Sequence, residues 1–324
     1  MVQLSQAPEV ILLVGRSVGG GTEAHAGWLA EAFHRQGVPT LLYPLFPKHR
    51  VAGLKEEAME MVTLGSAYRR FIKNARSGHP ETVICFGRMA NSMGHRLLKD
   101  LPGTRVIATC RTNRRLPKPY RETLAVADHV LANSRWAADR VRQLPGWGGK
   151  APTVIPNALL RPDLLALEQN GPNRNQARLE LGLKEGGTVL CMLAHFLRGK
   201  NQEALIRMCS AGGFPRETQI LLVGEGPVQR SCQRLARHLG VAANVHFAGR
   251  VERLEQIFQA SDLIVSTSLR DSMPNALVEA QAAGLPAVAY DVAGVGESFL
   301  PGQSGLLVAA EDEIAFAEGV CKLV

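Results

Sequence analysis

The sequence of 324 residues lacks any apolar run near the roughly 18 residues that span a bilayer. Its first residues carry no basic segment ahead of the short apolar stretch at 9–14, which argues against a signal peptide. We expect a first β-strand there and a cytoplasmic protein. Since 46% of the residues are hydrophobic, the chain can form sizeable cores, and its length allows two domains.

Metal and disulfide motifs are also missing. The six cysteines show neither a Cys-x-x-Cys pair nor the spacing of a zinc site, so we expect reduced thiols. No Asp-x-Asp motif occurs. We therefore predict no metal site and no cofactor.

Acidic residues are scarce in only one half of the sequence. Residues 1–160 contain 22 Lys/Arg and 11 Asp/Glu, a net charge of +11. Residues 161–324 contain 15 and 18, a net charge of −3. Such asymmetry favours a partner for the basic half, such as nucleic acid, an anionic membrane or an acidic substrate, although an ordinary basic surface is the alternative.

The N-terminal segment predicts a βαβ unit with a glycine-rich first turn. Strands are expected at 9–14 and 39–45, with a helix at 22–35 between them. The turn contains Gly-x-Gly-x-x-Ala at 19–24, which is typical of dinucleotide sites. Such sites also need an acid at the end of the second strand, and residues 43–45 contain none, so the NAD interpretation loses half of its support.

Strands and helices alternate along the rest of the chain, which favours an α/β fold with doubly wound parallel sheets. A polar stretch with glycine and proline at 161–176 is typical of a linker. We therefore expect one Rossmann-like domain at 1–160 and another at 161–324. A helix at 54–76 is basic and aromatic in its second half, as in membrane-surface helices, but a solvated face is the simpler interpretation.

The most informative segment covers 266–297. An apolar strand leads into a polar loop, and Pro274 suits the first turn of a short helix that Gly284 would end. The N-terminus of that helix would offer N–H groups to a phosphate. Asp271 and Glu279 lie eight positions apart, so both carboxylates can face one crevice.

This segment resembles the donor-binding segment of family 4 retaining glycosyltransferases, which have the GT-B fold of two Rossmann-like domains facing across a cleft. The family pattern is an acid and, eight positions later, Glu, with Pro-Asn between them and a following Gly-Gly-x-x-Glu. Here it reads Asp271, Pro274-Asn275 and Glu279, followed by 293–297 with alanine in place of the first glycine. Asp271 is one methylene shorter than the usual Glu.

The resemblance implies roles for residues in the C-terminal half. Lys200, Asp271 and Glu279 are the expected catalytic set, with Lys200 on the phosphates, Asp271 on sugar hydroxyls and Glu279 on the ribose. The other expected donor-binding residues are Gly20, Gly21, His195, Arg198, Gly224, Arg250, Met273, Pro274, Asn275, Ala276 and Leu277. His195 stands where the family commonly has Arg.

Expected acceptor-side residues come from the N-terminal half. Gly20, Gly21 and Glu23 resemble the family's Gly-Gly-x-Glu loop. After the fourth strand, relatives often carry a histidine at the reacting centre, and here Cys110 or Arg111 takes that place. A neutral thiol is a poor proton carrier compared with histidine. Relatives also usually continue with a final helix, whereas this sequence stops at Val324 in a helical stretch.

The resemblance implies a metal-independent, retaining hexosyltransferase that uses a nucleotide-sugar, with a UDP-sugar as the expected donor. The expected acceptor is an anionic glycan or lipid-linked acceptor, as in lipopolysaccharide or other cell-envelope synthesis, and we expect no nucleic-acid partner. Peripheral contact with the cytoplasmic face of the inner membrane would fit. The alternatives are a nucleotide-sugar epimerase of the same architecture and a non-catalytic subunit that binds a nucleotide or glycan.

Overall fold

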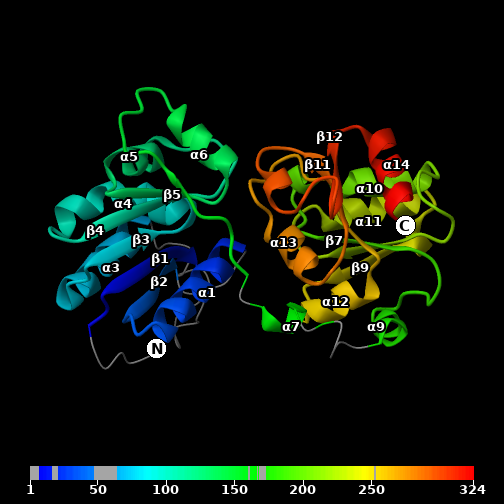
Figure 1. Cartoon of the computed structure of the whole chain (residues 1–324), viewed down its shortest axis with the longest axis horizontal. Coiled ribbons are helices and arrows are strands. Elements are labelled where there is room, and N and C mark those ends of the chain that lie inside the picture. Colours follow the sequence, from blue (N-terminus) through cyan, green and yellow to red (C-terminus); the bar gives the residue numbers. More distant parts are fainter. Residues whose placement is uncertain are drawn as a thin grey trace. The chain divides into compact units, whose positions relative to one another are not determined.

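The computed structural model describes residues 7–16, 21–46, 64–159, 161–165, 167, 173–251 and 253–324. The chain divides into two compact units, Met1–Ala158 and Leu159–Val324. Each unit contains one six-stranded sheet with helices between the strands (Figure 1). We call them the first and the second unit.

The sheet of the first unit is entirely parallel, in the order β2-β1-β3-β4-β5-β6. Because the chain goes from β1 to one side and then returns to the other, the order reverses between β1 and β3. Its strands are β1 (Val10–Arg16), β2 (Thr40–Phe46), β3 (Thr82–Cys85), β4 (Arg105–Cys110), β5 (His129–Ala132) and β6 (Thr153–Val154).

Two apolar clusters fill the two faces of this sheet. The smaller cluster lies under α1 (Gly21–Arg35), and the larger one lies under the four other helices that the structure describes in this unit. Those helices are α3 (Leu64–Gly78), α4 (Gly87–Asp100), α5 (Lys118–Val126) and α6 (Arg135–Arg142). The helices thus cover both faces, as a doubly wound sheet requires.

Alternation along β4 decides where its last residues point. Successive side chains of a strand face opposite sides of the sheet. Ala108 and Cys110 belong to the larger cluster, whereas Ile107 packs on the α1 side. Arg111 continues the alternation toward the α1 side, where its guanidinium lies over the ring of Phe86.

The second sheet is also parallel, in the order β12-β11-β10-β7-β8-β9, and it reverses between β7 and β10. Its strands are β7 (Val189–Leu193), β8 (Gln219–Val223), β9 (Val245–Gly249), β10 (Leu263–Ser266), β11 (Ala287–Asp291) and β12 (Gly305–Ala309). The four central strands β7, β8, β10 and β11 are buried along all or nearly all of their length, which is typical of parallel sheets covered on both faces.

The helices of the second unit again form two layers. The layer on one face consists of α10 (Gln202–Ser210), α11 (Gln229–His238) and α14 (Glu313–Leu323). The other consists of α7 (Pro162–Leu165), α9 (Arg174–Glu180), α12 (Leu254–Ala260) and α13 (Asn275–Ala282). Short 3-10 turns lie at η1 (Arg198–Lys200), η2 (Ala242–Asn244) and η3 (Val295–Glu297).

The predicted fold of two doubly wound parallel sheets is confirmed. The predicted end of the helix at Gly284 is also found, since Gly284 follows α13 in a left-handed conformation with φ 77°. Pro274 is the N-cap of α13 rather than part of its first turn, one position earlier than expected. Ala293, which replaces a family glycine, also has a positive φ of 47°, a conformation that glycine adopts more easily.

Candidate active site

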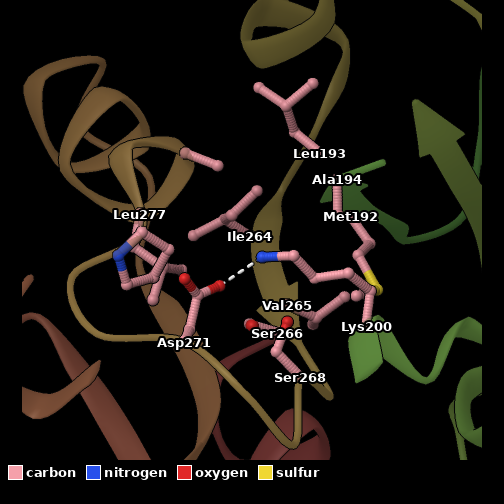
Figure 2. A pocket seen from close by; sticks show the side chains of 12 residues that line it. Met192, Leu193, Ala194, Lys200, Ile264, Val265, Ser266, Ser268, Asp271 and Leu277 are labelled. Carbon is pink, nitrogen blue, oxygen red and sulfur yellow. Dashed lines mark hydrogen bonds and ion pairs between the residues drawn. The ribbon is translucent and has the colours of Figure 1, made fainter. Parts of the chain in front are cut away.

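A pocket lies at the carboxyl ends of β7 and β10, where the order of the second sheet reverses. In open α/β sheets this is where ligands bind, because the loops after the two strands diverge there. Met192, Leu193 and Ala194 line it from β7 and the loop that follows. From β10 and the segment beyond, the lining residues are Ile264, Val265, Ser266, Ser268, Asp271, Pro274, Ala276 and Leu277 (Figure 2).

Lys200 is the cation that lines this pocket. Its backbone closes η1 through a bond from its N–H to the carbonyl of Leu197, 2.8 Å. The segment after β10 holds this turn, since the amide of Leu269 donates to the carbonyl of Gly199, 2.9 Å, and Thr267 donates to that of Asn201, 2.8 Å. Loops from two adjacent strands therefore fix the position of Lys200.

The ammonium group of Lys200 forms an ion pair with the carboxylate of Asp271, and the two side chains meet across the pocket (Figure 2). Both side chains are about four-fifths buried, with 22% and 18% of their surface exposed. The pocket thus combines three donor N–H bonds of an ammonium with an acceptor carboxylate. Such a pair can contact a phosphate and a hydroxyl of one ligand.

Glycines let the loop after β8 pack directly on the loop after β7. A Cβ at Gly224 would lie 2.2 Å from the carbonyl oxygen of Ala194, and one at Gly226 would lie 2.4 Å from that of Phe196. The φ of Gly224 is 131°, which also favours glycine. This close packing at Gly224 fixes the loop that carries His195.

Glu279 lies on α13, apart from the residues that line the pocket. Only 8% of its surface is exposed, and burial raises the pKa of its carboxyl. Arg161 opposes this rise, while the nearby carboxylate of Asp163 adds to it. Arg161 is itself shared, because its guanidinium pairs with Asp163 at 2.5 Å and with Glu255 at 3.7 Å.

The structure therefore joins Lys200 and Asp271 at one pocket with Pro274, Ala276 and Leu277, and it does not place Glu279 in its lining. The remaining expected donor-side residues of this unit differ in exposure. Exposed side chains are those of His195, Arg198 and Arg250, whereas Met273 is buried and Asn275 is half-buried. Arg161 was not identified from the sequence, since its link to Glu279 joins positions 118 apart.

In the first unit, the expected acceptor-side residues occupy contrasting environments. Gly20 lies outside the described residues, Gly21 begins α1, and Glu23 lies in its first turn. Cys110 is fully buried in the larger cluster, and burial raises the pKa of its thiol to about 11. Its thiol is therefore neutral and without exposed surface at pH 7.

Two further groups meet near Phe86 on the α1 side. Arg111, which the sequence suggested, is joined there by His25 of α1, which it did not. The ring centroids of His25 and Phe86 are 6.3 Å apart. The sequence signal for His25 is a histidine at a helix position whose neighbours, Ala26 and Ala30, face the core.

Both groups of polar side chains, Lys200 with Asp271 and Arg111 with His25, thus lie near the carboxyl ends of strands in doubly wound sheets. Residues 187–324 match the model of the family described as "Glycosyl transferases group 1". This match covers the strands, turns and helices that form the pocket of the second unit.

Curated relatives extend the similarity. The chain is 32% identical over 200 residues to the D-inositol 3-phosphate glycosyltransferase of Rhodococcus erythropolis. That alignment covers 58% of this chain and 43% of the relative, so the chain matches less than half of the relative's length.

Solved structures show the same fold across the chain. Sucrose-phosphate synthase from Thermosynechococcus elongatus matches with a TM-score of 0.77 and 18% identity, covering 97% of this chain and 89% of that one. HepE of Anabaena in complex with UDP-glucose matches with a TM-score of 0.73 and 18% identity, covering 96% and 88%.

The fold and the matched segment define a protein of the GT-B class. Residues 187–324 match the model of the group 1 glycosyltransferases, and the match includes the segment from Asp271 to Glu297 that carries the resemblance stated above. Within the described part of the chain, no helix is long and apolar enough to cross a membrane.

Proposed function

We propose that this protein is a glycosyltransferase that transfers a sugar from a nucleotide diphosphate sugar to an anionic acceptor. The observation that carries the proposal is the Lys200–Asp271 pair at the pocket of a segment that matches the group 1 family. The activity needs positive charge where the diphosphate leaves and an acceptor for sugar hydroxyls, and these two side chains supply both.

Lys200 would stabilise the charge that grows on the leaving diphosphate. Interactions that strengthen toward the transition state raise the rate, whereas uniform binding lowers only the KM. Asp271 would orient the sugar, and Glu279 would bind the ribose hydroxyls. The N–H groups at the start of α13, beside Pro274, would add donors to the phosphate.

UDP is the nucleoside diphosphate that we propose for the donor, because the Anabaena protein of similar fold was solved in complex with UDP-glucose. The name of the Rhodococcus relative supports an anionic acceptor, since it specifies an inositol phosphate. The charge of +11 on residues 1–160 agrees with that class of acceptor. We also propose retention of configuration, metal independence and a cytoplasmic site of action, with peripheral contact to an anionic membrane.

A donor panel tests the proposal. UDP- and GDP-sugars are incubated with the protein and acceptor phosphates, and released nucleotide and transfer product are measured. Lys200→Ala should lower kcat more than it raises the donor KM. An unchanged kcat in this variant contradicts the catalytic role of Lys200.

The same panel separates the alternatives. An epimerase would interconvert free nucleotide-sugars without transfer, and a binding subunit would show affinity without turnover. Activity should persist in EDTA, and loss in the chelator with rescue by Mg²⁺ or Mn²⁺ would overturn the metal-free proposal. The anomeric configuration of the product, read by NMR, tests retention.

A further inference from the structure

Arg111 is a half-buried cation, and no acidic side chain in the described ranges of the chain forms an ion pair with it. Its guanidinium lies 5.9 Å from the ring centroid of Phe86, and its Nε is buried without a hydrogen-bond partner. Burial lowers the pKa of Arg111 to about 10, and no carboxylate offsets this effect. The group is therefore charged at pH 7 and poorly compensated.

His25 adds a second buried polar atom beside the same ring. His25 is 9% exposed, and its Nδ1 atom is buried without a hydrogen-bond partner. Burial and then the charge of Arg111 lower the pKa of His25 to about 4, while a hydrogen bond with the backbone of Ala158 opposes the shift. The imidazole is therefore neutral at pH 7.

Folding alone gives no reason to keep this arrangement. Removing the Nε–H of a guanidinium from water costs free energy that only a hydrogen bond or an opposite charge recovers. A ligand would supply the missing partner. Arg111 follows β4 and Phe86 follows β3, at the carboxyl edge of the sheet where ligands of this fold class bind.

The backbone around Arg111 is fixed on both sides. The hydroxyl of Tyr120 donates to the carbonyl of Thr109 at 2.6 Å. The guanidinium of Arg140 donates to the carbonyls of Thr112 and Arg114 at 2.7 and 2.5 Å. Arg111 is therefore held in place before any ligand arrives, which lowers the entropy lost on binding.

We propose that Arg111 and His25 form an oxyanion subsite in the first unit that binds the phosphate group of the acceptor. The planar guanidinium suits the oxygens of a phosphate, and the neutral imidazole can hydrogen-bond a hydroxyl or oxygen beside it. The acceptor assignment rests on the proposed function, whereas the binding of an oxyanion does not.

Phosphate titration tests the subsite directly. Thermal stability is followed in inorganic phosphate for the wild type, for Arg111→Met and for Arg105→Met, which removes an exposed arginine at the other end of β4. The wild type and Arg105→Met should gain stability with phosphate, and Arg111→Met should bind phosphate at least about tenfold more weakly. A phosphate response that survives in Arg111→Met overturns the proposal.

The imidazole provides a second readout that folding effects do not imitate. Phosphate beside Arg111 should raise the pKa of His25, which NMR of the histidine ring reports during a pH titration at two phosphate concentrations. Arg111→Lys should keep part of this shift, because it keeps the charge. If the pKa of His25 is the same at both phosphate concentrations, the subsite is contradicted, and this result does not depend on whether Arg111→Met folds.

Two probes separate the possible sources of the phosphate. Inositol 1-phosphate represents the acceptor and UDP represents the donor. Affinity for inositol 1-phosphate should fall in Arg111→Met while affinity for UDP stays within twofold of the wild type. The reverse pattern assigns the subsite to the donor and overturns the acceptor assignment. If UDP fails to bind the wild type at all, the proposed function fails while the phosphate result stands independently.

Discussion

Lys200 and Asp271 satisfy one another in the structure, although each is expected to contact a different part of the donor. A diphosphate that binds alone must compete with the carboxylate for the ammonium. A nucleotide-sugar offers hydroxyls to Asp271 at the same time, so the carboxylate exchanges one partner for another. The pair would therefore favour the complete donor over the nucleoside diphosphate that remains after transfer.

Asp271→Asn should tighten the binding of UDP about severalfold, because it frees the ammonium and removes a nearby negative charge. The same change should weaken the extra affinity that the sugar of UDP-glucose supplies. Calorimetry with both ligands measures the two effects. Glu313→Gln is a matched control, since Glu313 pairs with Arg207 in the same unit away from the pocket. Unchanged UDP affinity in Asp271→Asn contradicts the competition.

Glu279 predicts a dependence of stability on pH. Its pKa in the folded protein is raised above the ordinary value of 4.5, chiefly by burial, so the folded state favours the protonated form. Its favourable contribution is complete below pH 4.5 and is lost as the pH rises through the folded pKa. Glu279→Gln should therefore gain stability relative to the wild type between about pH 4 and pH 7.

Thermal melts of both proteins across that pH range measure this difference. Glu279→Gln replaces two charged acceptor oxygens by one neutral acceptor and an NH2 donor, so it should weaken the proposed bonds to the ribose hydroxyls and lower UDP affinity by about tenfold. A constant difference in melting temperature from pH 4 to pH 7 contradicts the raised pKa. Equal UDP affinity contradicts the ribose role.

The elements of both sheets were largely predictable because apolar runs bounded by polar turns identify buried parallel strands. The strand β12 (Gly305–Ala309) was missed, since its segment GLLVA follows the turn-rich stretch 301–304 and is short. The helix α9 (Arg174–Glu180) was not predicted, and it begins inside the expected linker at 161–176, because its sequence is almost entirely polar. Its stability comes from contacts distant in sequence, such as the bond from Arg178 to the carbonyl of Ala260.

The site residues were also predictable where a local pattern marks them and not where tertiary contacts bring them together. The motif from Asp271 to Glu279 was identifiable because its spacing is local, and the role of Lys200 was implied by the family resemblance. The pairing of Lys200 with Asp271, the effect of Arg161 on Glu279, and the approach of His25 to Arg111 depend on tertiary packing. No local pattern encodes them.

The helix α3 limits the forms that membrane contact could take. Its aromatic residues, Tyr68 and Phe71, are buried in the core, so they cannot insert into a bilayer from the folded state. Arg69, Arg70 and Lys73 belong to the polar part of the helix, and Arg70 donates to the carbonyl of Leu45. Any membrane contact of the described part of α3 would therefore be electrostatic.

Vesicles test that contact. The wild type should bind vesicles with anionic lipids at low salt and release them at high salt, and neutral vesicles should not bind it. Substituting Arg69 and Lys73 by Glu should reduce retention without changing UDP affinity, because the nucleotide pocket belongs to the second unit. Retention that is unchanged in this double variant removes α3 from the membrane proposal.

Charge is divided between the two halves of the chain, +11 in residues 1–160 and −3 in 161–324. The Debye length is about 8 Å at physiological ionic strength, and charges farther apart than this are largely screened. Salt therefore weakens the attraction that a charged surface exerts on a distant ligand. The affinity of the basic half for an anionic acceptor should therefore fall strongly as salt rises. The affinity for a donor that binds at the Lys200 pocket should depend less on salt, because the side chains there are largely buried.

Raising the salt concentration from about 20 to 300 mM should therefore increase the KM for a phosphorylated acceptor about severalfold, while the KM for the nucleotide-sugar changes less. Steady-state kinetics with each substrate varied in turn measures both constants, and an uncharged acceptor analogue provides the control. Vesicle binding that falls with salt, without a change in acceptor KM, would assign the basic half to a membrane surface instead. If neither quantity responds to salt, the charge asymmetry has no role in acceptor binding, and the phosphate site at Arg111 would have to act without long-range attraction.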